Sequence, residues 1–358
     1  MLFISSSDGP ALNDDQIREL DDEFFTARPV GYFTSRILSL LHDFDHTGTN
    51  PHAAEFLSVL GLRNAENPLA PTKSDRTLQA AIDALSARHH IAEAVVRLLH
   101  ALTELRTEND PRSTWATLAD GPTRPHTVVT QVKARLEAKP GLFSELLFKP
   151  PVPDNEGTRL AFDVAVSWVY RAIHLVTSNE LTTNAGYNKV KHGLAVRIRD
   201  DRRVDIVPGS AMQLDGNGDV RLSSFDASIP IVDKPEIAYL VRPYATPRQG
   251  LEVDSLLLDV PVILAETWMM TTVYGAVFHN AAAAHFTGRD EDIEPYPTLP
   301  TYPKAADLLD GRIQGFREVI TSPPDPSTPP RKSGLFQGNT FQHMDIDLAS
   351  RRTTTIVE

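Results

Sequence analysis

The sequence predicts a mainly α-helical protein: a helical bundle with a small inserted antiparallel β-sheet and a Pro-rich C-terminal tail. Three observations support this prediction. Apolar residues recur at helical spacing through most of the first 193 residues, the stretch 195–243 changes to alternating or β-branched runs, and proline, aspartate and threonine dominate from Thr287 onward. The expected parts are the bundle (1–193), the sheet (194–250), a long helix returning to the bundle (251–287) and a loosely ordered tail (288–358).

The composition is that of a folded protein and narrows the range of partners. The 358 residues are 41% hydrophobic and 23% charged, which excludes wholesale disorder. A net charge of −12 argues against a broad nucleic-acid surface, so a phosphate-binding site is expected to be a local basic pocket. The chain has no cysteine, which excludes disulfides and thiolate zinc sites. We expect a cytoplasmic protein without a secretion signal, a cofactor or a resident metal.

The amino-terminal half is expected to form the bundle. Residues 14–45 are predicted to be helical, with Asp14 or Asp15 as the cap, and a short helix is expected over 51–61. The strongest helix is predicted over Thr77–Arg106, because two adjacent apolar rows cover most of its circumference, as at the centre of a bundle. A polar connection and three more helices are expected over residues 108–125, 127–139, 159–178 and 181–192.

The second half changes from strands to one long helix. The strands predicted over 195–243 include a hairpin whose turn is Asp215–Asp219. The apolar stretch 262–286 has the length of a membrane span but contains Glu266, which is expensive inside a bilayer. We therefore predict a buried core helix and no membrane association. An unpacked linker is expected over 321–330, and the three tryptophans are expected in the core.

Two of the predicted helices carry a polar row. The residues of the two rows are Asp83, His90, Glu93, Arg97, His100 and Glu104 on the first helix, and Asp163, Ser167, Arg171 and His174 on the second. In one interpretation each row is the solvated face of an amphipathic helix. In the other, the rows face each other across a cleft, with Glu93 paired to Arg171 and Asp163 to Arg97.

One short string places amide, ammonium and imidazole groups together. In Asn184-Ala-Gly-Tyr-Asn-Lys-Val-Lys-His-Gly193, the residues Asn184, Asn188 and His192 fall at i, i+4 and i+8 of a helix, with Lys191 beside them. This pattern predicts a basic, hydrogen-bonding face. The alternative is an ordinary helix end, in which the lysines interact with the helix dipole and Gly193 is the cap.

The bundle and the Tyr187–His192 string resemble the HEPN superfamily of small all-α domains found in bacterial toxins and defence proteins. The family pattern is an arginine, a spacer of roughly four to six residues and a histidine, and two protomers together cleave RNA without metal. In this chain asparagine stands in place of the arginine. The resemblance implies a homodimer that binds RNA or another phosphate-bearing ligand. The implied catalytic residues are His192, Arg171 and Arg97, and the implied ligand-binding residues are Asn184, Asn188, Lys191, His90, Glu93 and His174.

Two other functional classes remain open. The string His42-Asp-Phe-Asp-His-Thr-Gly48 resembles the His-Asp-x-x-His-x-Gly signature of class I cyclic-nucleotide phosphodiesterases, which implies a metal-dependent phosphohydrolase using His42, Asp43 and His46. Pro51 stands where that family has asparagine, and no histidine precedes position 42, so a helix end and a turn are favoured. The third class is a non-catalytic interaction or scaffold protein, in which the polar rows are salt-bridge networks and the Pro-rich tail recruits a partner.

Overall fold

The computed structural model contains two compact units built from separate parts of the chain. The helical unit takes Met1–Ala70, Asp83–Ser178 and Val260–Leu308, and the sheet unit takes Pro71–Ile82, Asn179–Asp259 and Leu309–Glu358. The residues that the structure describes are 11–45, 73–104, 112–149, 152, 154–178, 183–191, 196–200, 204–206, 212–214, 220–222, 229–232, 234–242, 250–321, 332–337 and 340–343.

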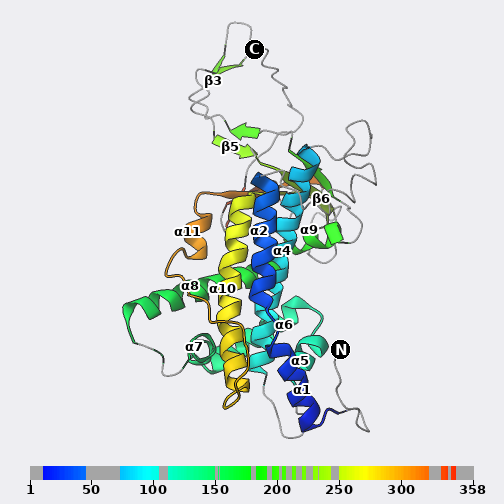
Figure 1. Cartoon of the computed structure of the whole chain (residues 1–358). Helices are drawn as coiled ribbons and strands as arrows, with labels where there is room; N and C mark the ends of the chain where they lie inside the picture. The colour runs from blue at the N-terminus through cyan, green and yellow to red at the C-terminus, as the bar shows by residue number, and fades with distance from the viewer. Residues whose placement is uncertain are drawn as a thin grey trace, which may run out of the picture. The chain divides into compact units, whose positions relative to one another are not determined.

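The helical unit is built around α10 (Val260–His285), shown in yellow in Figure 1. Its helices are α1 (Asp14–Phe25), α2 (Pro29–Asp45), α4 (Lys73–Thr103, grouped with the sheet unit up to Ile82), α5 (Thr114–Asp120), α6 (Pro125–Ala138), α7 (Leu142–Leu147), α8 (Glu156–Thr177), α10 and α11 (Ala305–Leu309). The helix α10 contacts α1, α2, α7 and α8. Most of its apolar side chains, among them Met270 and Phe278, are almost fully enclosed, as expected for a core helix.

Two of these helices also have the length and composition of membrane spans. In α8 and α10, 56% and 78% of the most apolar 18-residue window is buried inside the protein. Core helices of soluble proteins have the same length and apolarity, so length and composition alone do not distinguish the two cases.

The mainly helical fold with a small antiparallel sheet is confirmed, and several boundaries differ from those predicted. Residues 14–45 form two helices rather than one, because Pro29 starts α2 and has no amide hydrogen to continue the preceding helix. The cap of α1 is Asn13 rather than Asp14 or Asp15; it exchanges hydrogen bonds with Gln16 in a capping box. The predicted polar connection contains α5, capped by Ser113. The helix expected over 51–61 lies outside the described residues.

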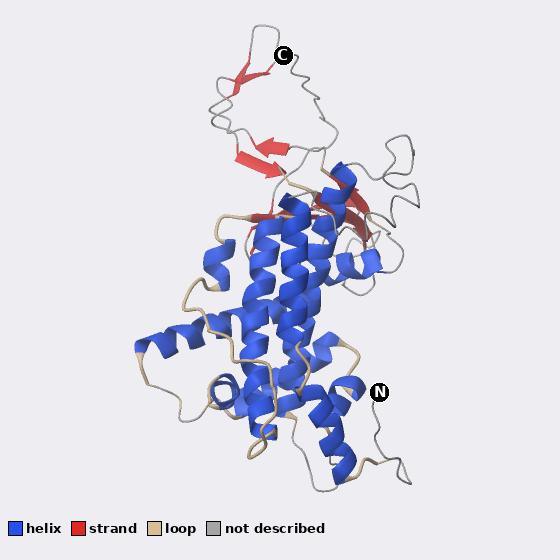
Figure 2. Ribbon diagram, viewed as in Figure 1, coloured by secondary structure: helices blue, strands red, loops and turns tan. Residues whose placement is uncertain are grey.

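The sheet unit contains one six-stranded antiparallel sheet, two strand pairs and a short helix, drawn in red and blue in Figure 2. The helix is α9 (Thr183–Lys191). The strand order is β1-β6-β7-β8-β9-β10, and the pairs are β2-β5 and β3-β4. The strands are β1 (Arg197–Arg199), β2 (Val204–Ile206), β3 (Met212–Leu214), β4 (Val220–Leu222), β5 (Ile229–Val232), β6 (Glu236–Val241), β7 (Leu251–Leu257), β8 (Ile313–Thr321), β9 (Gly334–Gln337) and β10 (Thr340–His343).

The sheet extends beyond the part of the chain in which it was predicted. Strand β7 lies in the range assigned to the long helix, and β8 to β10 lie in the stretch assigned to the tail, so both assignments were wrong there. The dominance of proline and aspartate after Thr287 concealed these strands, of which β8 pairs with the distant strand β7. Thr321 ends β8, and the rest of the predicted linker lies outside the described residues.

Only one of the three tryptophans belongs to the core. Trp168 is fully buried and its indole Nε1 donates to the carbonyl of Pro303 at 2.9 Å. Trp115 and Trp268 are 37% and 42% exposed, which corrects the prediction for both. A large indole is seldom fully enclosed unless its N–H also finds a partner, as it does at Trp168.

Candidate functional site

The residues predicted to form one site are divided between the two units. Asn184, Asn188 and Lys191 lie on α9 in the sheet unit, whereas His90, Glu93, Arg97, Arg171 and His174 lie on α4 and α8 in the helical unit. His192 lies outside the described residues, and of Asn184 only the backbone position in α9 is described. Neither unit by itself therefore contains the whole predicted set.

The helix α9 packs against the sheet through its glycine. A Cβ atom added to Gly186 would lie 2.9 Å from the Tyr239 ring and 3.1 Å from a methyl group of Leu256, so the close approach requires glycine. Gly186 and Tyr187 are buried, whereas Asn188 and Lys191 are exposed. The helical spacing thus places the predicted amide and ammonium on the face of α9 turned away from the sheet.

Arginines of β1 add positive charge at the same edge of the sheet. β1 is an edge strand that pairs with β6, and α9 also contacts β6. Arg197 is exposed opposite Ala238, and Arg199 Nε lies 3.9 Å from an oxygen of buried Glu236. Because side chains alternate along a strand, these arginines lie on the sheet face opposite Tyr239 and α9. The positive charges therefore flank the β1 edge from both faces.

Arg171 takes part in a buried ion cluster of the helical unit rather than in an open site. Glu266 is fully buried; Arg171 Nε donates to its Oε1 at 2.6 Å and Arg88 Nη1 to its Oε2 at 2.5 Å. Burial alone would raise the pKa of Glu266, but the two guanidinium groups outweigh it and lower that pKa. The predicted pairing of Arg171 with Glu93 is therefore wrong.

His174 lies one turn after Arg171 on α8. Burial lowers the pKa of its imidazole, and the positive charge of Arg171 lowers it further. A neutral imidazole at this position is a weak anion ligand, so the predicted role of His174 in binding phosphate has no support from its surroundings.

The polar row of α4 is engaged in contacts that fix the bundle. Glu93 and Arg97 form an i, i+4 pair at 2.7 Å, and Arg97 also donates to the carbonyl of Pro122 at 3.2 Å. The other contacts are His100 Nε2 to Gln131 Oε1 at 2.7 Å, Arg135 to the carbonyl of His100 at 3.1 Å, and His90 Nδ1 to Arg36 at 3.0 Å. Asp163 is bonded to Lys304 at 3.3 Å, so the predicted Asp163–Arg97 pair is also wrong.

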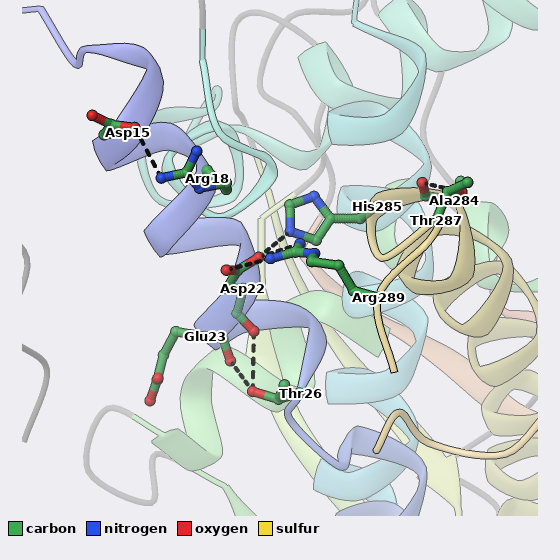
Figure 3. Close-up of polar contacts among 9 residues, drawn as sticks. All are labelled: Asp15, Arg18, Asp22, Glu23, Thr26, Ala284, His285, Thr287 and Arg289. Carbon is green, nitrogen blue, oxygen red and sulfur yellow. Dashed lines mark hydrogen bonds and ion pairs between the residues drawn. The ribbon is translucent and has the colours of Figure 1, made fainter. Parts of the chain in front are cut away.

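A second polar cluster, which the sequence did not indicate, joins α1 to the end of α10 (Figure 3). Asp22 accepts from Arg289 at 2.6 and 2.8 Å, and its Oδ1 lies 2.6 Å from His285 Nε2. The hydrogen bond from Arg289 is the largest cause of the lowered pKa of Asp22. Phe25 and Phe286 flank the imidazole. No local sequence pattern links residues 263 positions apart, so only the fold reveals this cluster.

The geometry of this cluster is that of a structural contact rather than that of a catalytic dyad. A catalytic His-Asp dyad presents its second ring nitrogen to a substrate. In His285 the nitrogen far from the backbone, Nε2, is taken by Asp22, which leaves Nδ1 next to the histidine's own Cβ and helix. The cluster therefore holds α1 against the bundle.

Within the described parts of the chain, no group of three or more His, Asp or Glu side chains is arranged to hold a metal ion. The side chains of His42 to Asp45 and residues 46–50 lie outside the description, so the His-Asp string remains a sequence hypothesis. Comparison with protein-family models, with curated proteins and with solved structures gives no match.

Proposed function

We propose that the protein binds a phosphate-bearing ligand, with RNA as the ligand class, through the exposed face of α9 and the β1 edge. The observation that supports this is the exposure of Asn188 and Lys191 on α9 together with exposed Arg197 on β1. In a chain of net charge −12, residues 184–203 carry six lysines and arginines against two aspartates. Such a local surplus attracts phosphates that the rest of the surface repels.

The chemistry follows from the residue types. Lysine and arginine hold phosphate oxygens by charge-assisted hydrogen bonds, and amide groups of asparagine add orientation. In the HEPN-like form of the proposal, a cytoplasmic dimer cleaves RNA and His192 moves the proton. Arg171 and Arg97 have no part in it, because Glu266 and Glu93 already hold their guanidinium groups.

The test measures the affinity of a labelled single-stranded RNA by fluorescence anisotropy at two salt concentrations. Lys191→Glu and Arg197→Glu are expected to weaken binding across all sequences and to reduce the slope against log salt by about one each. Lys133→Glu, at an exposed position of α6, makes the same charge change outside the sheet unit and serves as the control. Equal losses in all three variants, or no binding by the unmodified protein at low salt, would remove the proposal.

His192→Ala separates cleavage from binding. Loss of cleavage with retained affinity is expected of a proton-transfer group, whereas an unchanged cleavage rate would leave a binding protein only.

A scaffold role is the second candidate, favoured by the pairing of the α4 row with residues of the same unit. It predicts that Lys191→Glu leaves the affinity for RNA unchanged and that removal of the C-terminal tail abolishes binding of a protein partner. Truncation has to begin after His343, because cutting at Thr287 would remove β8, β9 and β10 from the sheet.

A further inference from the structure

The segment 287–304, called the strap below, follows α10 and runs back along it toward α11 (Figure 1, gold). It has no helix or strand of its own, yet it crosses the start of α2. The helix α2 begins at Pro29 without an acidic residue in its first turn. Its first free amides are capped from the strap: Glu294 Oε2 accepts from the amide of Val30 and Oε1 from that of Gly31, both at 2.9 Å.

This cap combines hydrogen bonding with charge. A carboxylate at a helix N-terminus satisfies amides that have no partner within the helix and interacts favourably with the helix dipole. Glu294 is only 6% exposed, so water does not readily replace it. Next to it, Arg28 is bonded to Asp292 of the strap at 2.6 Å. The start of α2 is thus held by two carboxylates from a distant part of the chain.

The same part of α10 receives both the strap and α2. A Cβ atom added to Gly275 would lie 2.5 Å from a methyl group of Val30 and 3.2 Å from Pro297. Neither segment can therefore approach α10 this closely unless position 275 is glycine. Both segments therefore pack on the same position of α10.

Elsewhere the strap is fixed near its two ends by ion pairs, of Arg289 with Asp22 and of Lys304 with Asp163, and between them by isolated hydrogen bonds. The carbonyl of Glu294 lies 2.7 Å from His279 Nδ1, Tyr296 donates to the carbonyl of Leu147 at 2.9 Å, and the carbonyl of Pro303 accepts from Trp168 at 2.9 Å. A segment held by few hydrogen bonds without its own ladder opens at a lower free energy than the helices beneath it.

We propose that the strap and the first turn of α2 open and close together as one cooperative unit, while α8 and α10 stay folded. Glu294 is the residue that holds the two segments together. Opening releases the cap of α2 and the Arg28–Asp292 pair in one step. This proposal does not rest on ligand binding at α9.

The test is hydrogen exchange of individual amides in the full chain. Glu294→Gln keeps the size of the side chain and removes its charge and one acceptor, so the amides of Val30 and Gly31 and those of the strap are expected to exchange roughly tenfold faster. Amides in the middle of α10, such as those of Met270 and Val273, are expected to be unchanged. Glu145→Gln, at an exposed residue paired with Lys139, removes the same charge from the same unit and is the control.

Gly275→Ala provides a second perturbation, from the α10 side. It is expected to accelerate exchange in the same two segments, since the new methyl group displaces both. The unmodified protein in low urea is the third measurement: the amides of the α2 start and of the strap are expected to share one opening free energy, below that of α10. Faster exchange confined to Val30 and Gly31, no change in either segment, or acceleration spread through α8 and α10 would overturn the proposal.

Discussion

Each unit contains a buried ion cluster, and the two clusters have opposite composition. In the helical unit two guanidinium groups, of Arg88 and Arg171, share the single carboxylate of Glu266. In the sheet unit two carboxylates share one guanidinium: Arg317 Nε lies 3.1 Å from Asp254 and 3.4 Å from Glu252. All of these side chains are at least nine-tenths buried.

The difference lies in what each cluster can do when it loses its central member. An arginine stays protonated at every accessible pH, whereas a buried carboxylate can take up a proton and become neutral. The partners also differ in how they are held. Arg88, Arg171 and Glu266 come from three helices, while Asp254 and Arg317 face each other on two hydrogen-bonded strands. The arginines of the helical cluster therefore cannot become neutral by losing a proton, and the cluster joins elements that only side chains connect.

Glu266→Gln is expected to have the largest effect. It leaves two arginines buried with no counter-charge in the cluster, and breaking a buried pair in this way costs about 3–5 kcal/mol. Tryptophan fluorescence follows the loss, because Trp115, Trp168 and Trp268 all belong to the helical unit. The free energy of unfolding in urea is expected to fall equally at pH 6 and pH 8. A change below about 1 kcal/mol, the range of an exposed ion pair, would show that Glu266 is better solvated than its burial indicates.

Arg317→Met is expected to have the next largest effect. It lowers the free energy of unfolding by about 2–4 kcal/mol at pH 8, because Asp254 and Glu252 then repel each other inside the sheet. A buried carboxylate that has lost its counter-charge can become neutral by taking up a proton, so the loss is expected to shrink as the pH falls. Hydrogen exchange in β7 and β8 at pH 8 and pH 5.5, corrected for intrinsic rates, measures this. A loss that is the same at both pH values would remove the proposed contrast between the clusters.

The parts of the fold that were predictable are those with their own periodicity. The helices α4, α8 and α10 were found because each carries a long apolar pattern, and α10 was identified as a core helix from Glu266 within an apolar run. Strands β7 and β8 were missed because they contain buried charge: in the sequence, Glu252, Asp254 and Arg317 look like residues of a polar surface. Only pairing across the sheet makes those residues interior.

For the predicted site, too, local periodicity revealed the helices but not their partners in the fold. Spacing on α9 placed Asn188 and Lys191 on one face, which the structure describes as exposed. Spacing on α8 also grouped Arg171 and His174, but periodicity does not state whether a polar stripe meets solvent or a buried partner. The partner that decides the matter, Glu266, lies 95 residues from Arg171. Long-range pairs of this kind leave no local pattern.

Gly186→Ala tests whether the sheet unit depends on close packing as strongly as on its ion cluster. The added methyl group falls 2.9 Å from the buried ring of Tyr239, so the helix or the ring has to move, at a cost of about 1–3 kcal/mol. Exchange in α9 and β6 is expected to accelerate. Gly157→Ala in α8 is the matched control, because its Cβ would meet only Asn155 at 3.4 Å. Equal behaviour of the two variants would mean that α9 is loosely attached.

The smallest expected effect is a pH dependence caused by His174, which lies beside the helical cluster. Burial and Arg171 lower its pKa from the ordinary value of 6.5. The unfolded chain then binds a proton below pH 6.5 that the folded chain does not, so His174 reduces the free energy of unfolding as the pH falls through that value toward the folded pKa. Asp22 does not interfere, because its pKa is lowered from 3.8 and it stays ionised in this window.

The measurement is urea unfolding followed by tryptophan fluorescence between pH 5.5 and pH 7.5, for the unmodified protein and for His174→Gln. The variant is expected to lose part of the decrease in the free energy of unfolding at acidic pH, since glutamine does not titrate. His126→Gln, on the first turn of α6, replaces a histidine elsewhere in the unit and is expected to keep the decrease. If His174→Gln steepened the pH dependence, the imidazole would be charged in the folded protein. The excess positive charge of the helical cluster would then be balanced by a group other than Glu266.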